Sequence, residues 1–265
     1  MARTAFIFIG HSHLSSIVSA LLPRAGESSG WDEGCEYFIF DTVRHGDNFQ
    51  FTVPDPEEGF ILNPVISDMV KETVNPEFKK IFVSMFGGNA HNALTLLEHP
   101  KPFDFILPEN PSRERLKEAL LLPSGYMRGF IDKLAEVYML NLATLRHAFP
   151  DTVVHIESPP PVGSDSFLMA NLDKYFEGQY DNPRPAPREL RYKLWRLHSA
   201  IIRDHAEAAG VSFLEYPQNT TDAQGFLLPA YYSNDATHAG PAYGLEVLKQ
   251  LEARFNCRFD GWRWL

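Results

Sequence analysis

The chain has 265 residues, a formal net charge of −10 and a sequence pI near 5.5. A hydrophobic content of 44%, with 13% aromatic residues, is enough to fill a sizeable core. The acidic balance argues against a nucleic-acid partner, which would need a basic face, and against docking on anionic lipid. We therefore expect neither nucleic acid nor a membrane as a partner; the oligomeric state stays open.

The N-terminal stretch MARTAFIFIG carries one arginine and a short apolar run before Gly10. This run is too short for a signal sequence or a membrane span, so it predicts a first strand from residue 5 and a cytoplasmic protein. Cys35 and Cys257 are too few and too far apart for a disulfide framework or a cysteine-rich zinc site. We expect two independent buried thiols.

Five short apolar runs rich in Ile, Val and Phe follow one another along the chain. They lack polar alternation, which is typical of strands covered on both faces of a parallel sheet. The runs span 5–10, 36–43, 79–88, 152–161 and 211–217. Helical patterns lie at 13–26, 124–150, 187–210 and 240–255. This alternation predicts an α/β fold, a three-layer α/β/α sandwich with a five-stranded parallel sheet.

Three stretches rich in Pro, Asp and Asn interrupt this alternation, near 44–78, 92–124 and 162–188. We interpret them as loop insertions in a single domain spanning 1–265, with a short helix within the first. The helical segment 187–210 also carries a series of basic residues. Because acidic residues are interspersed, we interpret the series as an ordinary solvated face: Arg188, Arg191, Lys193, Arg196 and Arg203.

Ligands of open parallel sheets bind beyond the carboxyl ends of the strands. Polar residues and glycines gather at those ends in this sequence. They are His11, Ser12 and His13 after the first strand, Gly46 after the second, Asn89 and His91 after the third, and Asp235 and His238 before the last helix.

Asp235 and His238 stand three residues apart at the start of the last helix. A histidine so placed presents Nε2 to a nucleophile while the carboxylate holds Nδ1–H and stabilises the imidazolium. A serine hydroxyl is a weak nucleophile without such a base, and Ser12 is the candidate. The backbone N–H groups of Ser12 and Gly46 and the side-chain amide of Asn89 are candidate oxyanion donors.

At this point the sequence resembles the SGNH hydrolases, also called GDSL-type esterases and lipases. The matching blocks are Gly10-His11-Ser12, Gly87-Gly88-Asn89 and Asp235-Ala236-Thr237-His238, with Pro241 and Gly244 after the histidine. His11 and Ala90 stand where the family usually has Asp, and the block around Gly46 is not recognisable as a motif.

The resemblance implies a flavodoxin-like fold and a serine esterase that hydrolyses or transfers a small acyl group through an acyl-enzyme on Ser12. An acetylated carbohydrate is the substrate that we expect on the resemblance alone. It further implies Asp235 and His238 as catalytic partners. Apart from the resemblance, we expect His11, His13 and His91 to line the substrate pocket rather than to bind a metal. Neither a metal nor an organic cofactor is needed.

Other interpretations stay open from the residues alone. Ser12 and Asp235 also suit helix capping, and Asn89 and Gly46 suit ordinary turns. The histidines raise the alternative of a metal-dependent phosphoesterase, although the order of the blocks differs from that class. The replacements at His11 and Ala90 leave room for a catalytically silent binding protein on the same scaffold.

Overall fold

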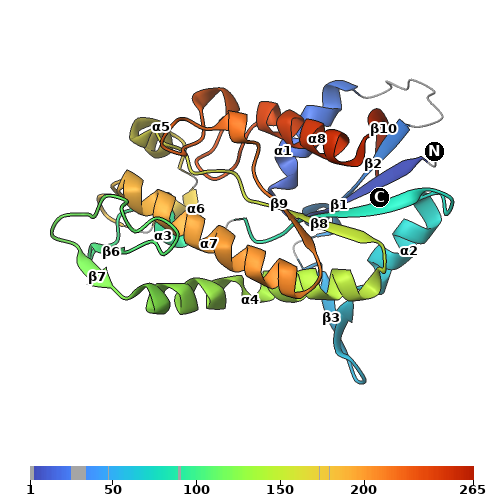
Figure 1. Ribbon diagram of the computed structural model, residues 1–265, viewed down its shortest axis with the longest axis horizontal. Coiled ribbons are helices and arrows are strands. Elements are labelled where there is room, and N and C mark those ends of the chain that lie inside the picture. Colours follow the sequence, from blue (N-terminus) through green and yellow to red (C-terminus); the bar gives the residue numbers. More distant parts are fainter. Residues whose placement is uncertain (1–2, 25–33, 47, 89–90, 173, 179) are drawn as a thin grey trace.

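The computed structural model describes residues 3–24, 34–46, 48–88, 91–172, 174–178 and 180–265. Its centre is a six-stranded sheet in the order β10-β2-β1-β5-β8-β9, in which all neighbouring strands pair in parallel (Figure 1). The strands of this sheet are β1 (Thr4–Gly10), β2 (Gly34–Asp41), β5 (Lys79–Met85), β8 (Thr152–Ile156), β9 (Ser212–Leu214) and β10 (Arg258–Trp264).

The five predicted runs form β1, β2, β5, β8 and β9, and the α/β fold class is confirmed. Taken as the first to fifth strands of the chain, they lie in the order 2-1-3-4-5, which is the flavodoxin-like order. The sheet has one strand more than predicted, because β10 pairs with the outer edge of β2. Its sequence, RFDGWRW, mixes charged and aromatic residues and so lacks the continuous apolar run of a central strand.

Helices cover both faces of the sheet. Helices α1 and α8 pack on one face, whereas α2 and α4 lie on the other (Figure 1). Successive residues of β1 alternate between them: Phe8 belongs to the core under α1 and α8, and Ile9 to the core under α2 and α4. The helices are α1 (Leu14–Leu21), α2 (Pro64–Thr73), α3 (Asn92–Thr95), α4 (Ser124–Ala148), α5 (Asp165–Ala170), α6 (Lys174–Glu177), α7 (Arg188–Ala208) and α8 (Pro241–Phe255).

The insertions contain short elements of their own. The first holds the antiparallel hairpin β3 (Thr52–Asp55) and β4 (Gly59–Leu62) and then α2, the predicted short helix. The second holds the parallel pair β6 (Phe103–Phe105) and β7 (Leu120–Leu122). Single-turn 3₁₀ helices complete the described structure: η1 (Leu22–Arg24), η2 (Thr42–His45), η3 (Gln218–Thr220) and η4 (Pro229–Tyr231).

Both cysteines are free thiols; Cys35 is buried, whereas Cys257 is half-buried. Of the helices in the described ranges, none combines the length and the apolar character that crossing a bilayer requires.

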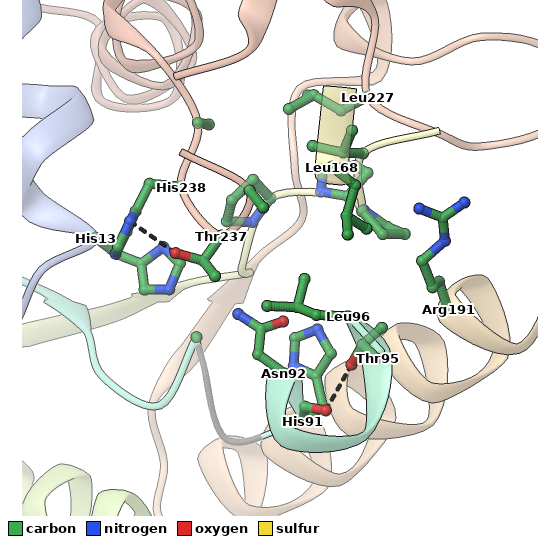
Figure 2. A pocket seen from close by; sticks show the side chains of 17 residues that line it. His13, His91, Asn92, Thr95, Leu96, Leu168, Arg191, Leu227, Thr237 and His238 are labelled. Carbon is green, nitrogen blue, oxygen red and sulfur yellow. Dashed lines mark hydrogen bonds between the residues drawn. The ribbon is translucent and has the colours of Figure 1, made fainter. Parts of the chain in front are cut away.

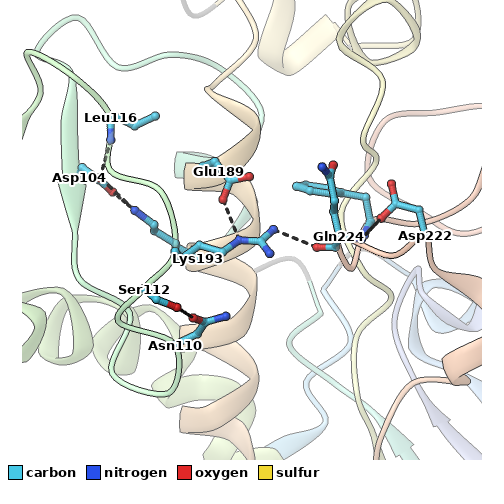
Figure 3. A network of polar contacts seen from close by, with 10 residues as sticks. Asp104, Asn110, Ser112, Leu116, Glu189, Lys193, Asp222 and Gln224 are labelled. Carbon is cyan, nitrogen blue, oxygen red and sulfur yellow. Dashed lines mark hydrogen bonds and ion pairs between the residues drawn. The ribbon is translucent and has the colours of Figure 1, made fainter.

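The expectation of a solvated basic face on α7 is wrong for Arg191 and Lys193, which are each only 1% exposed. The ammonium of Lys193 donates to both carboxylate oxygens of Asp104 at 3.0 Å, and one of these oxygens also accepts from the Leu116 N–H (Figure 3). This buried ion pair fixes the second insertion to α7. Sequence periodicity did not reveal it because the partner carboxylate lies 89 residues away.

Candidate active site

Ser12 lies in the tight turn between β1 and α1. The carbonyls of His11 and Ser12 accept hydrogen bonds from the N–H groups of Leu14 and Ser15, which closes the turn at 2.9 and 3.0 Å. The N-cap position of α1 belongs to His13, and its side chain makes no capping bond. Ser12 is therefore not the cap of this helix, and its hydroxyl faces a partner elsewhere in the chain.

That partner is His238, in the loop before α8. The Ser12 hydroxyl donates to Nε2 of His238 at 2.8 Å, and Nδ1–H of the same ring donates to Oδ1 of Asp235 at 3.0 Å. The imidazole is mostly shielded, with 19% of its side chain exposed. The structure thus brings together the three residues predicted as nucleophile, base and orienting acid, 226 residues apart at the extremes.

Backbone geometry holds Asp235 in place. Its Oδ1 accepts from the N–H groups of Thr237 and His238, both at 2.8 Å, and from the Thr237 hydroxyl at 2.9 Å. Its Oδ2 accepts from the Ser233 hydroxyl at 3.2 Å. Sequence reasoning missed Thr237 and Ser233, although Ser and Thr close to an Asp commonly form such turns.

These contacts determine the charge of the carboxyl group. Burial raises the pKa of Asp235, but the hydrogen bond and charge of His238 and the two backbone N–H groups lower it by more. The net effect holds the pKa of Asp235 well below its usual range, so the group is ionised at neutral pH. An ionised carboxylate on Nδ1–H keeps the tautomer in which Nε2 accepts a proton.

Close packing of α1 on α8 sets the distance between serine and histidine. A Cβ on Gly244 would lie 2.5 Å from the carbonyl carbon of Ser16 and 3.0 Å from the N of Ile17. Only glycine permits this approach. Because Ser12 precedes α1 and His238 precedes α8, this crossing determines how the Ser12 hydroxyl and the His238 ring lie relative to each other.

A narrow pocket with a cavity volume of about 30 Å³ opens beside His238 (Figure 2). The structure places the predicted pocket residues His13 and His91 in its wall, and the rings of His13 and His238 lie 4.9 Å apart. Gly88 permits this arrangement, since a Cβ there would lie 2.5 Å from Cδ2 of His13. Apolar side chains supply much of the remaining wall, among them Leu96, Leu168 and Leu227.

His11 lies apart from this pocket. Its ring packs against Phe86 and Tyr138, at 5.3 and 5.8 Å between centroids, and it lines a second hollow beside β3 and α4. Burial lowers the pKa of His11, against the opposing charge of Asp41. His11 and His13 therefore line different hollows. Within the described ranges, no three side chains of His, Cys, Asp or Glu form a group suited to a metal ion.

Of two predicted oxyanion donors, Asn89 and Gly46, the structure describes only Gly46. Asn89, together with its neighbour Ala90, lies outside the described residues. Gly46 follows η2 with a φ of +100°, and its N–H donates to the Val43 carbonyl at 3.4 Å. That amide is engaged within its own turn, so Gly46 as an oxyanion donor stays a prediction.

Sequence reasoning also missed two buried histidines behind His91. The rings of His91 and His198 lie 4.6 Å apart, and the Ser84 hydroxyl lies 3.1 Å from Nδ1 of His155. Burial lowers the pKa of His198 to about 4 and that of His155 to about 3. The pKa of His91 is likewise well below its ordinary value, through burial and then the charges of His198 and His13. All three rings are therefore neutral at pH 7.

Neither a scan against protein-family models nor a search of curated proteins finds a match. Among solved structures, the chain is similar to a carbohydrate acetylesterase from Sinorhizobium meliloti, with 12% identity, 96% of this chain and 98% of that chain covered, and a TM-score of 0.39. It is similar to an M. smegmatis aryl esterase, with 13% identity, 96% and 98% covered, and a TM-score of 0.42. A GDSL-like lipase from Bacteroides thetaiotaomicron has 13% identity, 95% and 87% covered, and a TM-score of 0.36. The observation that this structure itself provides is the pair of hydrogen bonds that joins Ser12, His238 and Asp235.

Proposed function

We propose that this protein is a serine ester hydrolase of the SGNH type. The observation that carries the proposal is the hydrogen bond of 2.8 Å from the Ser12 hydroxyl to Nε2 of His238, with Asp235 bonded to the other ring nitrogen. A serine is a weak nucleophile until a base within hydrogen-bond reach takes its proton. Here the base is within reach and its tautomer is fixed.

The reaction follows from this geometry in two halves. Oγ of Ser12 attacks the ester carbonyl while Nε2 of His238 takes the hydroxyl proton, and the ionised Asp235 stabilises the imidazolium. The tetrahedral intermediate collapses, the imidazolium gives its proton to the departing alcohol, and an acyl-Ser12 ester remains. Water then repeats the attack with His238 as base and releases the carboxylic acid and free serine. An acceptor alcohol in place of water would make the same site an acyltransferase.

The tetrahedral intermediate needs donors for its oxyanion, and we assign this role to the backbone N–H of Ser12 and the side chain of Asn89. The N–H of Gly46 would join them by exchanging its 3.4 Å bond to the Val43 carbonyl for the oxyanion. The pocket beside His238 accommodates only a compact group, which supports a small acyl ester as the substrate. An acetylated carbohydrate fits this class and rests on the resemblance to SGNH hydrolases.

Turnover of p-nitrophenyl acetate by Ser12→Ala tests the proposal, with Ser15→Ala as the matched control. Ser15 is exposed and lies in the first turn of α1, so the same deletion of a hydroxyl leaves the triad untouched. We expect turnover to fall by about 10³-fold or more in Ser12→Ala and to stay near the wild-type value in Ser15→Ala. Equal activity of the two variants would overturn the proposal.

A further inference from the structure

Arg191 is a buried cation in the wall of the pocket that contains His238. It projects from the first turns of α7, is 1% exposed, and lies across the pocket from His238 (Figure 2). Arginine side chains are rarely buried unless all their donors are paired. Its presence in the same pocket as His238 therefore needs a physical reason.

Only part of this guanidinium is paired. Nη2 donates to the carboxylate of Asp165, which is itself 61% exposed at the start of α5. Nε and Nη1 are buried and have no hydrogen-bond partner among the described residues. Unpaired buried donors are unfavourable, and a charged donor is more so. The site is therefore suited to an acceptor that the described part of the chain does not provide.

The remaining described wall of the pocket carries no carboxylate to satisfy these donors. Its other lining residues are histidines, small polar residues, prolines and aliphatic side chains. The neighbouring cation Arg188 does not line this pocket; its Nη2 donates to Asp222 at 2.7 Å, and its Nε is buried without a partner among the described residues. A negatively charged group entering this pocket would meet one partly paired guanidinium, shielded from water in a wall that mixes apolar and polar side chains. Charge-assisted hydrogen bonds are stronger in such a shielded place than in water.

We propose that Arg191 binds an anionic group of the substrate, so that the preferred ester carries a carboxylate remote from the carbonyl under attack. This inference rests on the proposed ester hydrolase and specifies its substrate class. The carboxylate accepts from Nε or Nη1 of Arg191, while Asp165 keeps Nη2 and so orients the guanidinium.

Two matched pairs of esters test the inference, because the charge can lie on either side of the ester bond. Mono-p-nitrophenyl succinate against p-nitrophenyl pentanoate places the carboxylate on the acyl group. Para-acetoxybenzoate against para-tolyl acetate places it on the alcohol. The readout is the ratio of kcat/KM for the charged and neutral ester of each pair, measured for wild type, Arg191→Met and Arg191→Lys.

We expect one pair to lose its charged-to-neutral ratio by about ten- to a hundred-fold in Arg191→Met, the range of a hydrogen bond to a charged group. Arg191→Lys, which keeps the charge, should retain an intermediate ratio. Arg203→Met is the control: it removes a guanidinium that pairs with Glu215 near the other end of the same helix, and it should leave both ratios unchanged.

The outcomes separate the two proposals. Ratios that stay within about three-fold of wild type in both Arg191 variants, with esters still hydrolysed, would overturn the anion site and leave the hydrolase standing. A wild-type protein that turns over none of the four esters and does not react with a fluorophosphonate would overturn the hydrolase itself. Far-ultraviolet circular dichroism shows whether each variant is folded. If Arg191→Met does not fold, the charged-to-neutral ratio of kcat/KM in Arg191→Lys alone tests the anion site.

Discussion

Gly244→Ala tests whether the crossing of α1 and α8 sets the geometry of the triad. The added Cβ would lie 2.5 Å from the carbonyl carbon of Ser16, whereas carbon atoms in contact are normally about 3.5–4.0 Å apart. The obstructing atoms are backbone, so the two helices must separate by roughly 1 Å. That displacement lengthens the 2.8 Å bond from Ser12 to His238 directly.

We expect two measurable consequences. Overpacking of this kind lowers the free energy of unfolding by about 1–3 kcal/mol, seen as a lower midpoint in urea. A misplacement of this size costs on the order of 10²-fold in kcat/KM for p-nitrophenyl acetate. The loss of kcat/KM should be larger than the fraction of Gly244→Ala protein that is unfolded under the assay conditions would account for.

Gly129→Ala is the matched control, because it makes the same change inside α4, where a Cβ meets no atom within 4 Å. Alanine is the better helix former, so this variant should gain about 0.5–1 kcal/mol and keep full activity. A Gly244→Ala protein as stable and as active as Gly129→Ala would refute the reasoning.

Three further predictions concern charge and pH. Asp235→Asn should lower kcat by about 10³–10⁴-fold near neutral pH, because an amide does not stabilise the imidazolium; a loss under about tenfold would contradict this role. Burial holds the pKa of His155 at about 3 and that of His198 at about 4, below the ordinary value. Below about pH 6.5 the unfolded chain binds protons on these two rings, whereas the folded chain keeps them neutral. Their contribution to the free energy of unfolding is therefore fully present above about pH 6.5, and the free energy falls below that pH by about 1 kcal/mol per pH unit for each ring. Urea unfolding at a series of pH values measures this slope, and a flat profile down to about pH 5 would contradict it. Lys193→Met should lower the free energy of unfolding by about 3–5 kcal/mol, because it leaves the carboxylate of Asp104 buried without its cation; urea unfolding that shows no loss would contradict a buried pair.

The central sheet could be predicted because its inner strands are buried on both faces and so read as apolar runs. Strand β10 could not, because it is an edge strand in which Arg258 and Arg263 interrupt the pattern. The buried cations of α7 were misread for a related reason. Composition shows how many charges a helix carries, but the pairing of Lys193 with Asp104 is a long-range contact that local sequence does not reveal.

The juxtaposition of Ser12, His238 and Asp235 could be predicted because each stands in a short block at a strand end or helix start, and parallel topology brings those positions to one edge. The histidines were harder to assign. His11 and His13 are two positions apart in sequence, yet they line different hollows. Arg191 had no sequence signal of its own, since its significance lies in burial and in donors without partners.

The most direct test of the account is intact mass after incubation with a fluorophosphonate, followed by peptide mapping of the adduct. We predict a single adduct on Ser12, absent in Ser12→Ala and formed more slowly in Asp235→Asn. A folded wild-type protein that gains no mass, or that is labelled at a residue other than Ser12, would contradict the assignment of Ser12 as the nucleophile.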